Sequence, residues 1–147
     1  MILNRTKEVL KVMSEQVANK FVEALGRLEA GRDLKGIVGL FAEDCEVGNV
    51  VSPDKFHGRE GARDFWGAKY RDTFGEVRST FRNVFAAEGR AALEWTTEGT
   101  ANDGTPVKYD GVSILEIEGE EVKRFCAYFD AGSLGRQLTG KGQAQGG

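Results

Sequence analysis

The chain has 147 residues, 40% hydrophobic and 29% charged, with a formal net charge of −3, and this length is typical of one domain with a sizeable core. The slight acidic balance excludes the basic surface of a nucleic-acid-binding protein and a polybasic segment for anionic lipid. No stretch approaches the roughly 20 apolar residues of a membrane span, and the first residues lack a signal peptide's apolar segment, so we expect a cytoplasmic protein.

Two helices are predicted at the start of the chain. Apolar residues recur at three- and four-residue spacing between Leu10 and Leu28, as on one face of an amphipathic helix. Thr6 is its expected N-cap, and Gly31 lies just past its end, where a left-handed residue is needed. Asp33 is expected to cap a shorter second helix, whose apolar face would comprise Leu34, Ile37, Val38 and Phe41.

A short strand and a third helix come next. The strand is predicted at residues 45–51, and the turn residues Ser52-Pro53-Asp54 end it. Phe56-His57-Gly58 then leads into a helix, whose apolar positions again follow the helical period. These positions are Ala62, Phe65, Trp66, Tyr70 and Phe74.

From Glu76 onward the hydrophobic period changes to two, and Val77, Phe81 and Phe85 alternate with polar residues. Glu88-Gly89, Asn102-Asp103-Gly104 and Glu118-Gly119-Glu120 predict hairpin turns. The four strands between them are expected at residues 77–86, 91–100, 107–117 and 122–130. Helices followed by an antiparallel meander predict an α+β domain. We expect this single domain to span residues 1–138, followed by a disordered tail at 139–147.

Three short motifs occur in a specific order: residues 34–41 followed by Ala42-Glu43-Asp44, then the Phe56-x-Gly58 step, and finally Tyr128-Phe129-Asp130. With this order the sequence resembles the SnoaL-like branch of the nuclear transport factor two-like superfamily. Ketosteroid isomerase, limonene epoxide hydrolase and polyketide cyclases share this fold. Covering about residues 14–138, the resemblance implies a cystatin-like cone, in which a curved mixed or antiparallel sheet wraps N-terminal helices around an interior site, and a dimer through the sheet's outer face.

The reactive residues of ketosteroid isomerase are replaced in this chain. Asn49 matches the position of that enzyme's carboxylate base, and it cannot take up a proton at neutral pH. Phe21 matches its tyrosine, and Ser113 matches the acid that donates a hydrogen bond. The isomerase reaction is therefore not expected.

The residues of limonene epoxide hydrolase are also replaced, apart from Asn49. Val47, Glu94 and Thr96 match its tyrosine, its arginine and one aspartate, and Ala127 matches the aspartate that activates water. The aspartate of the cyclases aligns near Ala127 as well. Asp130 lies three residues on, so we expect it to face the other side of the sheet and to cap the strand end.

The same resemblance implies which side chains face the interior. The predicted ligand-binding residues are Phe21, Val47, Asn49, Phe65, Trp66, Thr96, Tyr109, Ser113, Phe125, Ala127 and Phe129. Glu94 would also face inward, whereas the outer face would carry Leu93, Trp95, Val112, Ile114, Cys126 and Tyr128. Such an apolar outer patch favours a homodimer.

Glu94 and Asn49 are the candidate catalytic residues. Burying an ionised carboxylate in an apolar cavity costs free energy, so Glu94 would be poised to act as an acid or base, with Asn49 orienting the ligand. Alternatively, Glu94 pairs with a nearby cation or lies at a wet cone mouth. His57, the single histidine, is either a general base or a hydrogen-bonding residue at the helix start, and its position before a helix favours the second role.

Three functions fit these residues. The protein is an isomerase, cyclase or hydrolase for a small hydrophobic molecule (polyketide-, terpenoid- or steroid-like), a binding protein for such a molecule, or a non-catalytic dimerisation or partner-recognition module. No cofactor is expected, and Cys45 and Cys126 have no metal-binding spacing. The replaced reactive residues favour the binding protein.

Overall fold

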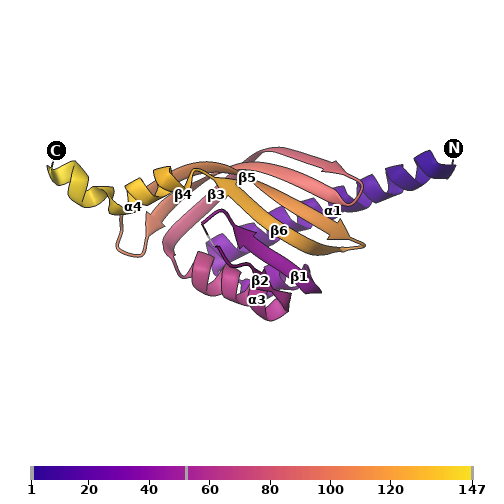
Figure 1. Ribbon diagram of the computed structural model, residues 1–147, viewed down its shortest axis with the longest axis horizontal. Helices are drawn as coiled ribbons and strands as arrows, with labels where there is room; N and C mark the ends of the chain where they lie inside the picture. The colour runs from indigo at the N-terminus through magenta and orange to yellow at the C-terminus, as the bar shows by residue number, and fades with distance from the viewer. Residues whose placement is uncertain (1, 52, 147) are drawn as a thin grey trace.

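The computed structural model describes the backbone of residues 2–51 and 53–146 and the side chains of residues 5–51 and 53–139. Helices pack against a curved six-stranded sheet (Figure 1), which confirms the predicted α+β class. Within these described ranges no helix is both long and apolar enough to cross a membrane.

The sheet is mixed. Its strands are β1 (Phe41–Asn49), β2 (Phe56–His57), β3 (Phe74–Ala87), β4 (Arg90–Ala101), β5 (Pro106–Glu118) and β6 (Glu121–Phe129), and they lie in the order β2-β1-β6-β5-β4-β3. β1 is parallel to β6, and the other neighbours are antiparallel. The hairpins turn at Gly89, Gly104 and Gly119, each with a positive φ, so the four predicted meander strands and their turns are confirmed.

Helix α1 (Ile2–Gly31) runs along the sheet and packs mainly on β3 (Figure 1). It begins before Thr6, so the predicted N-cap was wrong. At its C-terminal end the left-handed residue is Arg32, with φ 58°, rather than Gly31. The N–H of Arg32 donates to the carbonyl of Leu28 at 2.9 Å, which satisfies one of the last carbonyls of the helix.

Helix α2 (Leu34–Val38) is capped by Asp33, as predicted, and the Asp33 side chain accepts from the N–H of Gly36 at 3.5 Å. Phe41 was wrongly placed on this helix, since it opens strand β1. Glycines at 36 and 39 lower the helix propensity, and Phe41 instead pairs with Val122 of β6.

Helix α3 (Gly58–Asp64) continues into a π-helical segment, η1 (Phe65–Arg71). The wider turn departs from the helical period on which the prediction relied. Phe74 therefore does not extend the helix, but begins β3.

A bulge interrupts β3 between Phe81 and Asn83, where the register against β4 shifts. An extra residue in one strand inverts the side-chain alternation beyond it. Phe85, predicted on the same face as Phe81, is therefore on the opposite face and is 65% exposed.

The side chains of β4 that point to the interior are the alternate set to the one predicted. Leu93 pairs with Ser113 and Trp95 pairs with Gly111, and paired residues point to the same side of a sheet. Leu93 and Trp95 are therefore buried inside rather than part of the outer patch, whereas the inward face predicted for β5 and β6 is correct. A register error of one residue moves every side chain of a strand to the other face.

A helix that the sequence analysis did not predict, α4 (Ala131–Gly146), follows β6. Its backbone continues into the segment 139–147, and the side chains after residue 139 lie outside the described residues. The division of the chain into a domain at 1–138 and a disordered tail at 139–147 stays a prediction.

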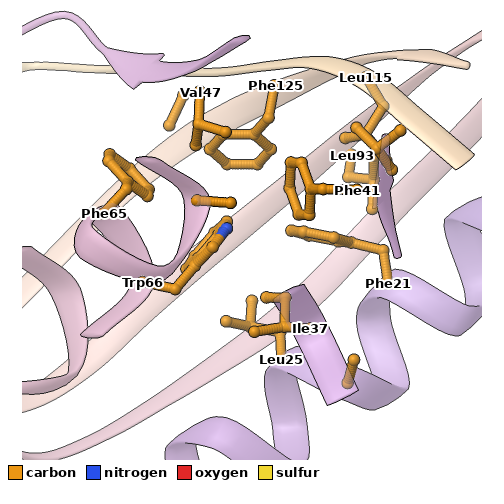
Figure 2. Packing of buried hydrophobic residues seen from close by; sticks show 14 of the residues in the cluster. Phe21, Leu25, Ile37, Phe41, Val47, Phe65, Trp66, Leu93, Leu115 and Phe125 are labelled. Atoms are coloured by element: carbon orange, nitrogen blue, oxygen red, sulfur yellow. The ribbon is translucent and has the colours of Figure 1, made fainter. Parts of the chain in front are cut away.

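The core lies between α1, η1 and the inner face of the sheet. Aromatic rings dominate it (Figure 2): Phe21, Phe41, Trp66 and Phe125 are all buried, and their ring centroids lie 4.9–6.5 Å apart where they contact. Edge-to-face and tilted pairs of this kind stabilise a core beyond the area they bury.

Gly111 is required by the close approach of Trp95. A Cβ at this position would lie 2.5 Å from the indole ring and 2.7 Å from the carbonyl oxygen of Tyr128. We expect Gly111→Ala to lower the free energy of unfolding by about 1–3 kcal/mol. Gly26→Ala is the control, because nothing lies within 4 Å of a Cβ at Gly26 of α1, and it should stabilise by about 0.5–1 kcal/mol. Urea denaturation of both variants checks this, and equal effects would contradict it.

Candidate functional site

A cavity of about 340 Å³ lies between the helices and the inner face of the sheet. Residues of α1, β1, η1, β3–β6 and α4 line it, together with one residue of the turn after β1 and one of the turn after η1. They are Phe21, Leu25, Asn49, Val51, Phe65, Trp66, Lys69, Tyr70, Thr73, Phe74, Ser79, Trp95, Thr97, Tyr109, Ser113, Phe125, Ala127, Phe129, Ala131, Leu134, Gly135 and Leu138. The wall is thus mostly apolar with a few polar groups, which is the usual composition of a small-molecule site.

Most of the residues predicted to bind a ligand are brought together at this wall. Those at the wall are Phe21, Asn49, Phe65, Trp66, Tyr109, Ser113, Phe125, Ala127 and Phe129, and their contact with a ligand stays a prediction. Val47 is on the inner face but is fully buried in the core beside Phe125 (Figure 2), so it does not reach the cavity. The side-chain oxygen of Asn49 accepts from the N–H of Val51 at 3.0 Å and so shapes the following turn.

Glu94 and Thr96 do not face the cavity, because of the inverted face of β4. The Glu94 carboxylate accepts from the amide of Asn83 at 2.6 Å and lies 3.7 Å from the Arg82 guanidinium. The Thr96 hydroxyl bonds to the Asp110 carboxylate and to Arg82. Both residues belong to a charged network on the outer face, so the predicted role of Glu94 as a buried acid or base was wrong.

The sequence contained a signal for the correct face of β4. Ala91, Leu93 and Trp95 alternate with the polar residues Glu94 and Thr96, and such alternation places the apolar set inside. The resemblance to distant enzymes implies the opposite parity, which the structure shows to be wrong for this strand. Thr97 of β4 is absent from the predicted cavity residues for the same reason, and Ser79, which lies opposite it on β3, is absent because no inward face is predicted for that strand.

Trp95 is fixed at the cavity wall by a buried hydrogen bond. Its indole Nε1 donates to Ser113 Oγ at 2.9 Å. Its ring lies edge-on to Tyr109, with centroids 5.4 Å apart, and also contacts Phe129. Because the indole N–H already has an acceptor, Trp95 offers mainly its apolar surface to a ligand.

A carboxylate behind the wall organises the hydroxyl groups of the cavity. Glu29 of α1 accepts three hydrogen bonds: from the Tyr70 hydroxyl at 2.6 Å, from the backbone N–H of Ser79 at 2.7 Å, and from the Ser79 hydroxyl at 2.6 Å. Ser79 Oγ also lies 2.6 Å from Thr97 Oγ1. A hydroxyl carries a single hydrogen. Because Ser79 gives its hydrogen to Glu29, Thr97 is the donor in that pair and its hydrogen points to Ser79, whereas the hydroxyl hydrogens of Tyr70 and Ser79 point to Glu29.

Two tyrosines at the wall stay neutral at physiological pH. Burial raises the pKa of Tyr109 above that of an ordinary tyrosine, and the Glu29 charge raises it further. The pKa of Tyr70 is raised well above its ordinary value by burial first and then by the Glu29 charge. Both residues are therefore un-ionised phenols.

Helix α4 closes one end of the cavity. Leu134, Gly135 and Leu138 line it from this helix. Asp130 accepts from the N–H of Ser133 at 2.9 Å and thus caps the start of α4 rather than the strand end. The Gln137 side chain accepts from the N–H of Lys108 at 2.7 Å and donates to its carbonyl at 2.8 Å, which ties α4 to β5.

The remaining candidate residues lie away from the cavity. His57 is exposed in β2, and the hydrogen bond expected of its side chain at the helix start is not formed. Cys45 and Cys126 are buried and free. In the described part of the chain no group of three or more His, Cys, Asp or Glu residues could hold a metal ion.

A protein-family model, that of the SnoaL-like domain, matches residues 18–125 of the chain. Curated protein sequences contain no match.

Solved structures are similar in fold at low identity. TerC, crystallised with polyporic acid, is 18% identical with a TM-score of 0.74, covering 86% of this chain and 98% of its own. A protein from Catenulispora acidiphila with a ketosteroid isomerase-like fold, crystallised with trimethylamine, is 21% identical with a TM-score of 0.71, covering 80% and 91%. An NTF2-like protein of unknown function from Burkholderia pseudomallei is 22% identical with a TM-score of 0.75, covering 86% and 98%.

The Glu29 network generates a stability prediction. Replacing Glu29 by Gln removes the charge and one acceptor oxygen while Tyr70 and Ser79 still need partners, so we expect the free energy of unfolding to fall by about 1–2 kcal/mol. Glu23→Gln, an exposed position on the same helix, should change it by less than about 0.5 kcal/mol. Urea denaturation of the two variants measures the difference, and equal stabilities would show that the network contributes nothing.

Proposed function

The chain belongs to the SnoaL-like family, within the nuclear transport factor two-like superfamily, and we propose that it binds a small hydrophobic molecule in its interior cavity. The observation that carries this proposal is the cavity of about 340 Å³ with a largely aromatic wall. Cavities of small-molecule sites commonly measure about 300–1,000 Å³.

Nine aromatic side chains line the cavity, on both the helical side and the sheet side: Phe21, Phe65, Trp66, Tyr70, Phe74, Trp95, Tyr109, Phe125 and Phe129. Neighbouring rings form a connected wall, from Trp66 through Tyr70 and Phe74 to Tyr109, with centroids 5.5–6.4 Å apart. Such rings bury a flat, carbon-rich molecule with little loss of side-chain freedom, because each has only two rotatable bonds. A polyketide-, terpenoid- or steroid-like molecule has this character.

Binding is favoured over isomerase, cyclase or hydrolase activity by the groups at the wall. The ionisable side chains among the described lining residues are Lys69, Tyr70 and Tyr109. An ammonium group and two neutral phenols donate hydrogen bonds but do not accept protons. The carboxylate proposed as an acid or base, Glu94, belongs to the outer network. An open cavity also favours ligand binding over a role as a partner-recognition module, for which a filled core would be sufficient.

Filling the cavity tests the proposal. N-phenyl-1-naphthylamine is an uncharged aromatic dye whose fluorescence rises in apolar surroundings, and we expect it to bind the protein. Ala127→Phe places a ring inside the cavity and should weaken dye binding at least tenfold. Ala87→Phe makes the same change at an exposed strand end and should leave binding unchanged. Unfolding temperatures show that both variants are folded. Equal dye affinities for the two variants would contradict the proposal.

We also propose a homodimer through the outer face of the sheet. Val112, Ile114 and Tyr128 lie on this face, and Tyr128 is 44% exposed. The patch is smaller than the sequence suggested, because Leu93 and Trp95 face inward, and ion pairs surround it. Light scattering at micromolar concentration should give the mass of two chains. The Ile114→Glu variant should have the mass of one chain, because a charge is placed in the interface. The control Val9→Glu, on α1, should keep the mass of two chains. A single-chain mass for the unmodified protein would refute the dimer.

The cytoplasmic location stays part of the proposal. Both cysteines are buried free thiols, and cysteines usually stay reduced in the cytoplasm.

A further inference from the structure

Three exposed residues mark the mouth of the cavity. Of the residues that line it, Val51, Lys69 and Thr73 are exposed, whereas inner rings such as those of Phe21 and Trp66 are almost completely buried. Lys69 is in η1, and the other two residues of the mouth follow β1 and η1. The inner part of a ligand would therefore lie among apolar rings, and its outer part would meet water at this mouth.

The mouth carries a positive charge without a counter-ion. Lys69 is the charged residue among the described residues of the cavity lining. No carboxylate in the described part of the chain lies within ion-pair distance of its ammonium group. Thr73, also at the mouth, donates its hydroxyl hydrogen to the backbone carbonyl of Lys69 at 2.7 Å, a bond that does not involve the charge. The ammonium group is therefore available to a ligand.

The carboxylates beside this segment already have partners. Asp72 accepts from Arg71 at 3.0 Å and from Arg32 at 3.2 Å, and the hydrogen bond from Arg71 is the first cause that lowers the pKa of its carboxyl. Two cations and one anion leave this cluster positive. Glu29, a carboxylate that contacts η1, accepts three hydrogen bonds and is not part of the lining. The charges around the mouth thus favour a negative group.

The position of Lys69 also decides where such a group would lie. Moving an anion from water into an apolar cavity is costly, so the negative group of a ligand would stay at the mouth. The buried rings would then cover the apolar body of the ligand. A lysine side chain suits this arrangement, because its stem packs along apolar surface while its ammonium group stays in water.

We propose that the cavity selects amphipathic anions, whose hydrophobic body lies among the rings and whose oxyanion pairs with the Lys69 ammonium at the mouth. Sulfonates, sulfates, phosphates and carboxylates share this chemistry. The inference rests on the proposed function, since it names the ligand class of the same cavity. It makes Lys69 a residue that determines specificity.

Two dyes with the same skeleton test this inference. 8-Anilinonaphthalene-1-sulfonate is N-phenyl-1-naphthylamine with a sulfonate group added, so the ratio of the two affinities isolates the effect of the negative charge. Replacing Lys69 by Gln should lower the affinity for the sulfonate relative to the amine about two- to fivefold, as expected for one partly exposed ion pair. Lys69→Glu should lower the ratio on the order of tenfold, because repulsion replaces attraction.

Lys20→Gln and Lys20→Glu are the matched controls. Lys20 is an exposed residue of α1 outside the cavity lining, so these variants change the net charge equally and should leave the ratio unchanged. Unfolding temperatures show that all four variants are folded. Raising the salt from about 0.01 M to about 0.15 M shortens the Debye length from about 30 Å to about 8 Å. This change should lower the ratio for the unmodified protein and lower it less for Lys69→Gln.

The outcomes separate this inference from the proposed function. If both dyes bind and the Lys69 and Lys20 variants give the same ratio, the inference is wrong and the proposed function stands. If the sulfonate binds Ala127→Phe as tightly as the unmodified protein, it occupies the surface instead of the cavity, and the inference is again wrong. If neither dye binds, the inference and the proposed function are both wrong.

Discussion

The contact between Trp95 and Gly111 determines how the sheet presents its side chains. The indole lies over the glycine where a Cβ has no room, and it donates to Ser113 on the same strand. This contact requires Trp95 to pair with Gly111 and therefore Leu93 with Ser113. The alternation of side chains then places Thr97 at the cavity and Glu94 outside. The cavity and the outer charged network both depend on this register.

The polar groups of the cavity follow from a second constraint, the carboxylate of Glu29. Three donors from η1 and β3 converge on this carboxylate. Its charge fixes the directions of the Tyr70 and Ser79 hydroxyls, and through Ser79 that of the Thr97 hydroxyl. A chain of hydrogen bonds that ends on a charged acceptor has one low-energy direction. The wall therefore has one group of hydroxyls whose directions are set by a charge that lies outside the cavity lining.

Sequence reasoning succeeded where the pattern is local. The stripe on α1, the Asp33 cap and the turns at Gly89, Gly104 and Gly119 were found because each depends on residues close together in the chain. It failed at Phe74 and Phe85. A π-helical segment before Phe74 and a bulge before Phe85 each insert a residue into the regular helical or strand period. A period counted along the chain does not reveal such an insertion. At β4 the simple alternation of Ala91, Leu93 and Trp95 indicated the right face, and the resemblance to distant enzymes indicated the wrong one.

The sequence by itself determined the class of the domain, the family, the four meander strands and most of the apolar wall. These features follow from hydrophobic periodicity and turn chemistry, which are encoded in neighbouring residues. Only the tertiary structure decided that Glu94 lies outside, that Glu29 lies behind the cavity and that the Trp66 indole N–H has no hydrogen-bond partner among the described residues. Each of these depends on register and packing between segments distant in the chain, as with Glu29 and Ser79, which are 50 residues apart. No local pattern carries that information, because such a contact exists only once the strands have paired and the helix has packed on them.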